Sequence, residues 1–236
     1  GKLDLNNHPK LKPYHLERRI QHAVTGIAVY VLREHVLSTR ESILGLVVGV
    51  TSFATFHVQR HWRWLGLVDT MDTLFRTAFK GIIRKHEADG SIPSALYFLL
   101  GVLIVVVCCS KNLSSIAILT LAVGDPAAGI VGKMASVRTG NTHRRIYGDK
   151  SVAGTLGCGM CSALVCTAAV YFGFTRGRTY TAAAWPLLSL TLGVAAGAAE
   201  LVAVLDDNLT MPAAFCVVLR SGRWCGGGRK RRGGRI

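Results

Sequence analysis

The stretch LSSIAILTLAVGDPAAGIV, residues 113–131, decides the fold class, because it is an apolar run of the length that crosses a bilayer. A transmembrane helix needs about 20 mostly apolar residues to span the hydrocarbon core. The chain has six such runs: His22–Leu37, Ser42–Val58, Ile92–Cys109, Leu113–Val131, Val152–Phe174 and Ala182–Leu205. A seventh stretch, Leu209–Leu219, has about half that length. The sequence therefore predicts an all-α, polytopic transmembrane helical bundle with six spans and a short interfacial or re-entrant C-terminal segment.

The composition agrees with a membrane protein. Of 236 residues, 50% are hydrophobic and only 17% are charged, whereas soluble domains have about 25% charged residues. The net charge of +15 is also typical of nucleic-acid-binding proteins. Here, however, the basic residues form short clusters between apolar runs, which is the pattern of cytoplasmic loops. We therefore expect no nucleic-acid partner.

The distribution of the basic residues predicts the orientation. The segment before the first run, the connection after the second and the connection after the fourth carry 16 Lys and Arg, against 5 on the opposite side. The positive-inside rule then places the N-terminus in the cytoplasm. Residues 1–219 form the predicted membrane domain, and residues 220–236 form a basic, Gly/Arg-rich tail, also expected in the cytoplasm. Val68–Ile83 has the spacing of an amphipathic helix on the cytoplasmic surface.

Asp125 is the least expected residue of the quoted stretch. A carboxylate at membrane depth costs about 3 kcal/mol on insertion scales. With the predicted topology, further polar residues gather at the same face: Arg18, Arg19, His22, Asp149, Lys150, Ser151, Glu200, Asp206, Asp207 and Asn208. Carboxylates there add nothing to stability. Their oxygens are the ligands that Mg²⁺ or Ca²⁺ prefers, and nearby cations and loop amides bind phosphates.

The residues around Asp125 fit such a site. Gly124, Gly129 and Gly132 let a neighbouring backbone or a ligand approach closely. Pro126 lacks an N–H and is expected to break or kink the helix beside the carboxylate. The alternative is a packing face of small residues with a solvated aspartate.

The segment YGDKSVAGT, which starts at Tyr147, is not a P-loop, because Asp149 stands where that motif needs Gly. Lys150 at the mouth of a helix, with Ser151 as its N-cap, still suits an anionic group. The alternative is a plain capped helix with a surface lysine.

Five segments together resemble one protein family: ERRIQHAVTG (17–26), KHEADGSIPSALYFLLG (85–101), GDPAAGIVG (124–132), DKSVAGT (149–155) and DDNLTMP (206–212). They are similar, in order, to motifs of the CTP-dependent polyprenol, phytol and diacylglycerol kinases, relatives of phosphatidate cytidylyltransferases. The likeness is greatest to the short diacylglycerol kinases of the endoplasmic reticulum membrane. It implies transfer of a phosphoryl group from CTP to diacylglycerol at the cytoplasmic face, giving phosphatidate. Phytol or polyprenol kinase and phosphatidate cytidylyltransferase remain alternatives.

The resemblance also implies the site residues. Arg18, Arg19, Asp125 and Gly132 fall at positions that the family uses for activity, although Arg19 stands where the diacylglycerol kinases carry Lys. We expect Asp125, with Asp206 or Asp207, to bind the divalent cation. Arg18, Arg19 and Lys150 are expected to contact the triphosphate, with Ser151, Gly124, Gly129 and Gly132 lining the nucleotide site. His22 or one of the aspartates would accept the substrate hydroxyl proton.

Overall fold

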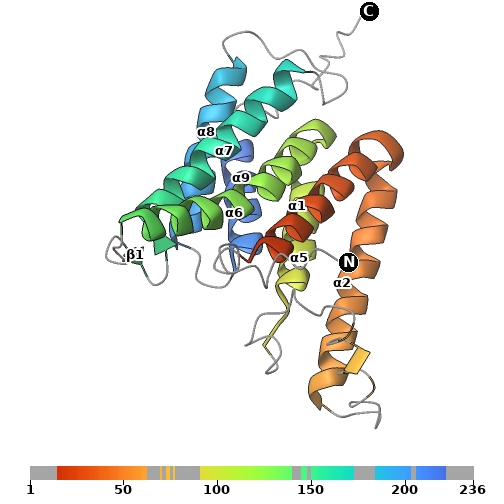
Figure 1. The fold of residues 1–236 in the computed structure, drawn as a ribbon. Helices are drawn as coiled ribbons and strands as arrows, with labels where there is room; N and C mark the ends of the chain where they lie inside the picture. The colour runs from red at the N-terminus through yellow and green to blue at the C-terminus, as the bar shows by residue number, and fades with distance from the viewer. Residues whose placement is uncertain are drawn as a thin grey trace, which may run out of the picture.

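The computed structural model describes residues 15–62, 91–139, 145–147, 150–172, 184–202 and 206–221, together with Thr70, Thr73, Leu74 and Thr77. Figure 1 shows the described chain as a bundle of helices. The elements are α1 (Leu16–Val31), η2 (a π-helix, Leu32–Val36), α2 (Thr39–Trp62), α5 (Ser94–Cys108), α6 (Lys111–Thr139), β1 (Arg145–Tyr147), β2 (Lys150–Ser151), α7 (Val152–Tyr171), α8 (Ala184–Val202) and α9 (Asp207–Ser221).

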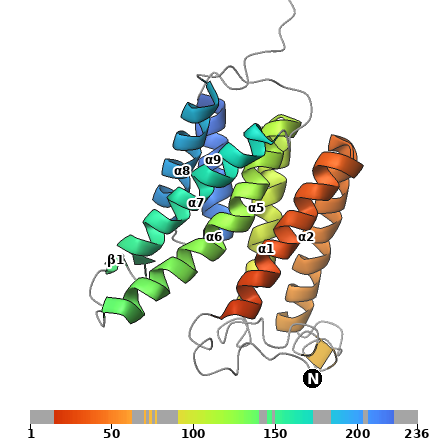
Figure 2. The ribbon, with the colours of Figure 1, turned by 45° about the horizontal axis from the view of Figure 1, so that its top comes forward.

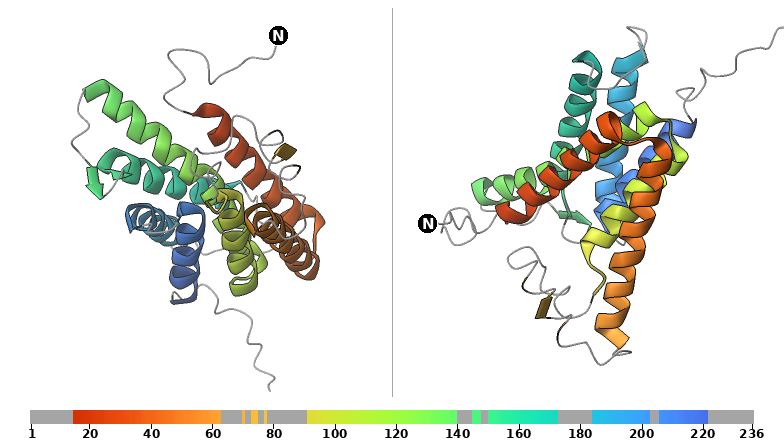
Figure 3. Two further views of the ribbon diagram at one scale, coloured as in Figure 1. Left: turned by 90° about the horizontal axis from the view of Figure 1, so that it is seen from below. Right: turned by 90° about the vertical axis from the view of Figure 1, so that its right-hand side faces the viewer.

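Helix α6 lies at the centre of the arrangement. It packs against α1 on one side and α7 on the other, and α9 and α5 also contact it. Figures 2 and 3 show α1 and α2 on one flank of the bundle and α7 and α8 on the other. The predicted all-α class is confirmed. One short antiparallel pair, β1 with β2, adds to it, with Tyr147 opposite Lys150.

Four of the six predicted spans are helices long and apolar enough to cross a membrane. These are Thr39–Gln59, Lys111–Arg138, Val152–Tyr171 and Trp185–Val202. The helix at the third predicted run, Ser94–Cys108, is apolar but shorter. On α7 the outward residues Leu156, Met160 and Leu164 are each at least 59% exposed. Their spacing of four residues gives a continuous apolar stripe, which suits contact with lipid.

The first predicted run differs from the others because charged residues interrupt it. Helix α1 starts earlier than predicted, at Leu16, and the run ends in a π-helix that contains Arg33 and Glu34, both 2% exposed. Buried charges need polar partners. Arg33 Nη2 donates to Thr39 Oγ1 at 3.3 Å, and Glu34 Oε2 accepts from Ser115 Oγ at 2.7 Å. These contacts join the α1–α2 turn to α6.

Helix α9 has a buried face. Met211, Phe215 and Leu219 are fully buried, and α9 packs along α5 and α8. Cys216 Sγ lies 3.9 Å from Cys109 Sγ, just after the last residue of α5. The seventh stretch was expected to lie at the interface or to re-enter the membrane. Two other helices cover its buried face, and its position relative to the membrane stays a prediction.

Close packing of α5 on α9 depends on Gly101. A Cβ atom added there would meet the carbonyl oxygen of Asn208 and lie 2.8 Å from Pro212 Cγ. Glycine therefore lets the first turn of α9 approach α5 closely.

Of the predicted amphipathic helix Val68–Ile83, only Thr70, Thr73, Leu74 and Thr77 are described; they are helical and exposed. The rest of that prediction, and the tail from residue 222, lie outside the described residues.

Candidate functional site

The site is built around Asp125, in the middle of α6. The helix runs unbroken from Lys111 to Thr139 with Pro126 inside it, so the expected break at Pro126 does not occur. Packing on both sides by α1 and α7 holds the helix together where the proline removes one hydrogen bond. The Asp125 side chain is 22% exposed.

His22 approaches Asp125 from α1. Its Nε2 atom lies 3.7 Å from Asp125 Oδ2, and the His22 side chain is 14% exposed. The imidazole ring also stands edge-on to Phe98 of α5, with ring centroids 5.2 Å apart. Nε2 is buried, and it forms no hydrogen bond to any residue that the structure describes. His22 is therefore held in place by the aromatic ring and keeps a nitrogen available.

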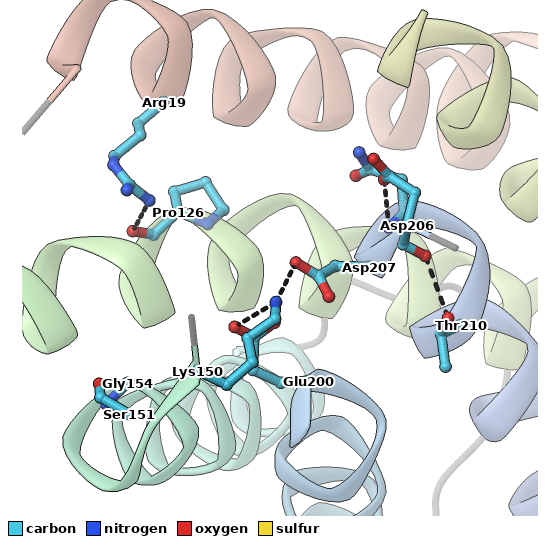
Figure 4. Close-up of polar contacts among 10 residues, drawn as sticks. Arg19, Pro126, Lys150, Ser151, Gly154, Glu200, Asp206, Asp207 and Thr210 are labelled. Carbon is cyan, nitrogen blue, oxygen red and sulfur yellow. Dashed lines mark hydrogen bonds and ion pairs between the residues drawn. The ribbon is translucent and has the colours of Figure 1, made fainter. Parts of the chain in front are cut away.

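Arg19 lies one turn before His22 and reaches α6 at another point. Its Nη1 donates to the carbonyl oxygen of Pro126 at 3.3 Å, as Figure 4 shows. The guanidinium group fills the space beside Gly129, where an added Cβ would overlap Nη1, Nη2 and Cζ. Gly129 is thus the residue that admits the Arg19 guanidinium to the surface of α6. Arg18 is half-buried on the same turn of α1.

Lys150 and Ser151 enter the site from the start of α7. Ser151 caps the helix as predicted, because its Oγ accepts from the Gly154 N–H at 3.1 Å. Lys150 is paired in the short ladder with Tyr147. Its Nζ donates to Asp207 Oδ2 at 2.6 Å and to Glu200 Oε1 at 2.9 Å. Figure 4 shows the ammonium group between these two carboxylates, which come from the end of α8 and the start of α9.

Asp125, Glu200 and Asp207 form one acidic group. Each offers a carboxylate oxygen, and the three oxygens lie within 4.8 Å of one another. Glu200 and Asp207 each keep a second buried oxygen, Oε2 and Oδ1, to which no described residue gives a hydrogen bond. A buried carboxylate oxygen without a partner is costly. A hard divalent cation would satisfy both oxygens, so these residues fit the predicted metal ion.

Of the predicted metal ligands, Asp125 and Asp207 are in this group and Asp206 is not. Asp206 Oδ1 accepts from the Asn208 N–H at 3.0 Å, and its carbonyl accepts from Thr210 Oγ1 at 3.0 Å. The Asp206 side chain therefore caps the start of α9. Glu200 takes the third position. Its place at the predicted cytoplasmic end of the sixth run was visible in the sequence, but nothing there distinguished it as a ligand.

The glycines of the motif face protein atoms. A Cβ at Gly124 would lie 2.5 Å from Ser162 Oγ, and one at Gly132 would lie 2.8 Å from Ser151 Oγ. These two glycines let α7 approach α6, which is the packing alternative stated for the motif. A nucleotide-binding role for Gly124, Gly129, Gly132 and Ser151 stays a prediction.

The electrostatics of the site keep Lys150 charged. Burial alone would lower the pKa of this lysine, but the charges and hydrogen bonds of Asp207 and Glu200 outweigh it, and the pKa is raised above its ordinary value. A protonated ammonium group therefore sits beside the acidic group throughout the physiological pH range.

Comparison with known proteins points to one relative. The chain is 25% identical over 215 residues to a protein of Schizosaccharomyces pombe named CTP-dependent diacylglycerol kinase 1. The aligned region covers 88% of this chain and 93% of that protein. No model of a protein family matches the chain. No solved structure matches it significantly. The similarity covers most of both chains and agrees with the resemblance of the five motifs.

Proposed function

We propose that the chain is a lipid kinase that transfers the γ-phosphoryl group of CTP to diacylglycerol and forms phosphatidate at the cytoplasmic face of the endoplasmic reticulum membrane. The similarity to a protein named for this activity supports the donor and the acceptor. The excess of basic residues in the connections at the site's end of the bundle supports the cytoplasmic face.

The observation that carries the proposal is the convergence of Asp125, Glu200 and Asp207. Asp125 of α6 is far in sequence from Glu200 of α8 and Asp207 of α9, and all three would hold one Mg²⁺ or Ca²⁺ ion. Phosphoryl transfer requires little from a protein beyond positioning and neutralisation of charge. A divalent cation bound there would neutralise charge on the phosphates of CTP.

Arg19 is placed to bind the phosphates from the opposite side. It comes from α1, and Gly129 admits its guanidinium group one turn beyond Asp125 on α6. A guanidinium group binds phosphate oxygens through two parallel hydrogen bonds. Arg18, on the same turn, would add a second cationic contact. The triphosphate would then lie between α1 and the acidic group.

His22 is the residue that we assign as the general base. Its buried Nε2 forms no hydrogen bond within the described chain, so the neutral Nδ1–H tautomer can accept a proton there. The hydroxyl of diacylglycerol would give its proton to Nε2 while its oxygen bonds to the γ-phosphorus. The bond from that phosphorus to the β–γ bridging oxygen breaks, and CDP leaves.

The test is a transfer assay on the full chain purified in detergent. CTP or ATP labelled at the γ-phosphate is supplied with diacylglycerol, phytol or dolichol, and labelled lipid and CDP are measured. We expect labelled phosphatidate with CTP and diacylglycerol, and loss of that product in Asp125→Asn. Labelled phytol phosphate as the main product would identify an isoprenoid alcohol kinase. Release of pyrophosphate with phosphatidate as acceptor would identify a cytidylyltransferase. Either outcome would contradict the proposal.

A further inference from the structure

Lys150 occupies one side of the acidic group. Its Nζ is bonded to Asp207 Oδ2 and Glu200 Oε1. An ammonium group at 2.6 and 2.9 Å from two carboxylate oxygens lies between two carboxylates, where the second ion of a paired-metal site would find oxygen ligands. In such sites two divalent ions, about 3.5–4 Å apart, share bridging carboxylates.

The backbone of Lys150 is fixed at this position. The residue pairs with Tyr147 in the two-stranded ladder, and the next residue, Ser151, caps α7. The side chain is 24% exposed.

The oxygens that Lys150 leaves unused lie in the least exposed part of the site. Glu200 Oε2 and Asp207 Oδ1 are buried and accept no hydrogen bond from the described residues, and the Glu200 side chain is only 9% exposed. Three carboxylates and one ammonium leave at most two negative charges. One divalent ion balances them, whereas two ions would leave an excess of positive charge in a poorly solvated site.

We propose that Lys150 is the built-in second cation of the site, and that it limits the group of Asp125, Glu200 and Asp207 to a single divalent ion. Lys150 is then a positioning residue that holds Glu200 and Asp207 together and turns their other oxygens toward the ion. This inference rests on the metal site of the proposed function.

The test counts bound ions and needs no activity. The full-length chain in detergent is titrated with Mn²⁺, and free Mn²⁺ is measured by its electron paramagnetic resonance signal. We expect one ion bound per wild-type chain and two per chain in Lys150→Met and Lys150→Gln, because removal of the ammonium group opens the second position. Lys150→Arg, which keeps the charge, and Lys133→Met, which removes an exposed lysine of α6, should each bind one ion.

The outcomes separate this inference from the proposed function. One ion in the wild type and one ion in both neutral variants would overturn the role of Lys150 and leave the metal site standing. Two ions in the wild type would overturn it as well. No ion in the wild type would overturn both proposals. The Gln variant is neutral but polar, so the count remains available if Lys150→Met fails to fold.

Discussion

Substitution of Gly129 by alanine tests the placement of Arg19 more selectively than removal of Arg19 itself. The added Cβ would occupy the space of the guanidinium group. The group is the end of a flexible side chain, so it can move away at little cost to the fold. Alanine also has a helix propensity about 0.8–1 kcal/mol better than that of glycine. We therefore expect Gly129→Ala to be as stable as the wild type, or slightly more stable, but to have lost the Arg19 contact to the phosphates.

The size of the effect follows from the contact that is lost. A hydrogen bond to a charged group contributes about 1.5–3 kcal/mol. If Arg19 makes this contact fully in the transition state, the rate falls roughly 10- to 150-fold. Gly124→Ala should behave differently, because the added Cβ meets Ser162 Oγ at 2.5 Å inside the α6–α7 packing. That variant should lose stability.

The assay is CTP-dependent phosphorylation of diacylglycerol per folded molecule, with Tm measured on the same samples. Gly45→Ala is the matched control, because an added Cβ has no described atom within 4 Å there; its activity should be unchanged. Arg19→Ala and the double variant Gly129→Ala/Arg19→Ala complete a double-mutant cycle. In that cycle, the second substitution should reduce the activity little beyond the effect of the first. Normal activity in Gly129→Ala, or two independent losses that multiply, would refute the reasoning.

Three further predictions concern α5, Lys150 and α9. Gly101→Ala should lower stability by about 1–3 kcal/mol, because the Asn208 carbonyl on the first turn of α9 must move; a Tm equal to that of the wild type would show that the turn yields easily. The raised pKa of Lys150 means that its stabilising contribution is present below the ordinary lysine value of about 10.4 and is lost as the pH rises through the higher folded-state value. The Tm difference between the wild type and Lys150→Met should therefore be retained from about pH 8 to 10 and shrink only above the ordinary lysine value; a difference that has vanished by about pH 9 would contradict the ion pairs. Helix α9 runs from the site toward the far end of α5, which would carry the C-terminus to the lumenal side, against the cytoplasmic tail expected from the charge pattern. An N-glycosylation acceptor appended to the C-terminus should then be modified, and an unmodified acceptor would support the cytoplasmic tail instead.

The apolar runs predicted most of the helices, because burial in lipid or in a helical core requires the same long apolar segments. They could not place α9. Its 15 residues are fewer than the about 20 that cross the hydrocarbon core, and only the packing of Phe215 and Leu219 shows that one face of the helix joins the core. The β1–β2 pair was also not predicted, because three- and two-residue strands leave no periodic pattern in a sequence.

The sequence predicted only part of the site, because it shows which residues are unusual but not which of them face one another. Asp125 and Lys150 stand out in the sequence because charge inside or beside an apolar run needs an explanation. Asp206 and Asp207 are adjacent, and only the start of α9 decides that the first caps the helix and the second faces Glu200. The glycines were predicted to approach a ligand. Small residues serve helix packing equally well, and the sequence alone does not separate the two uses.

The most direct test of the central claim compares two neighbouring carboxylates in the same assay. Asp207→Asn removes a proposed ligand of the ion. Asp206→Asn keeps a side chain that caps a helix as well as aspartate does. The rate of phosphoryl transfer from CTP to diacylglycerol, per folded molecule, should fall on the order of a hundredfold or more in Asp207→Asn. It should stay within a few-fold of the wild type in Asp206→Asn. Equal losses in both variants, or a loss confined to Asp206→Asn, would contradict a cation site made by Asp125, Glu200 and Asp207.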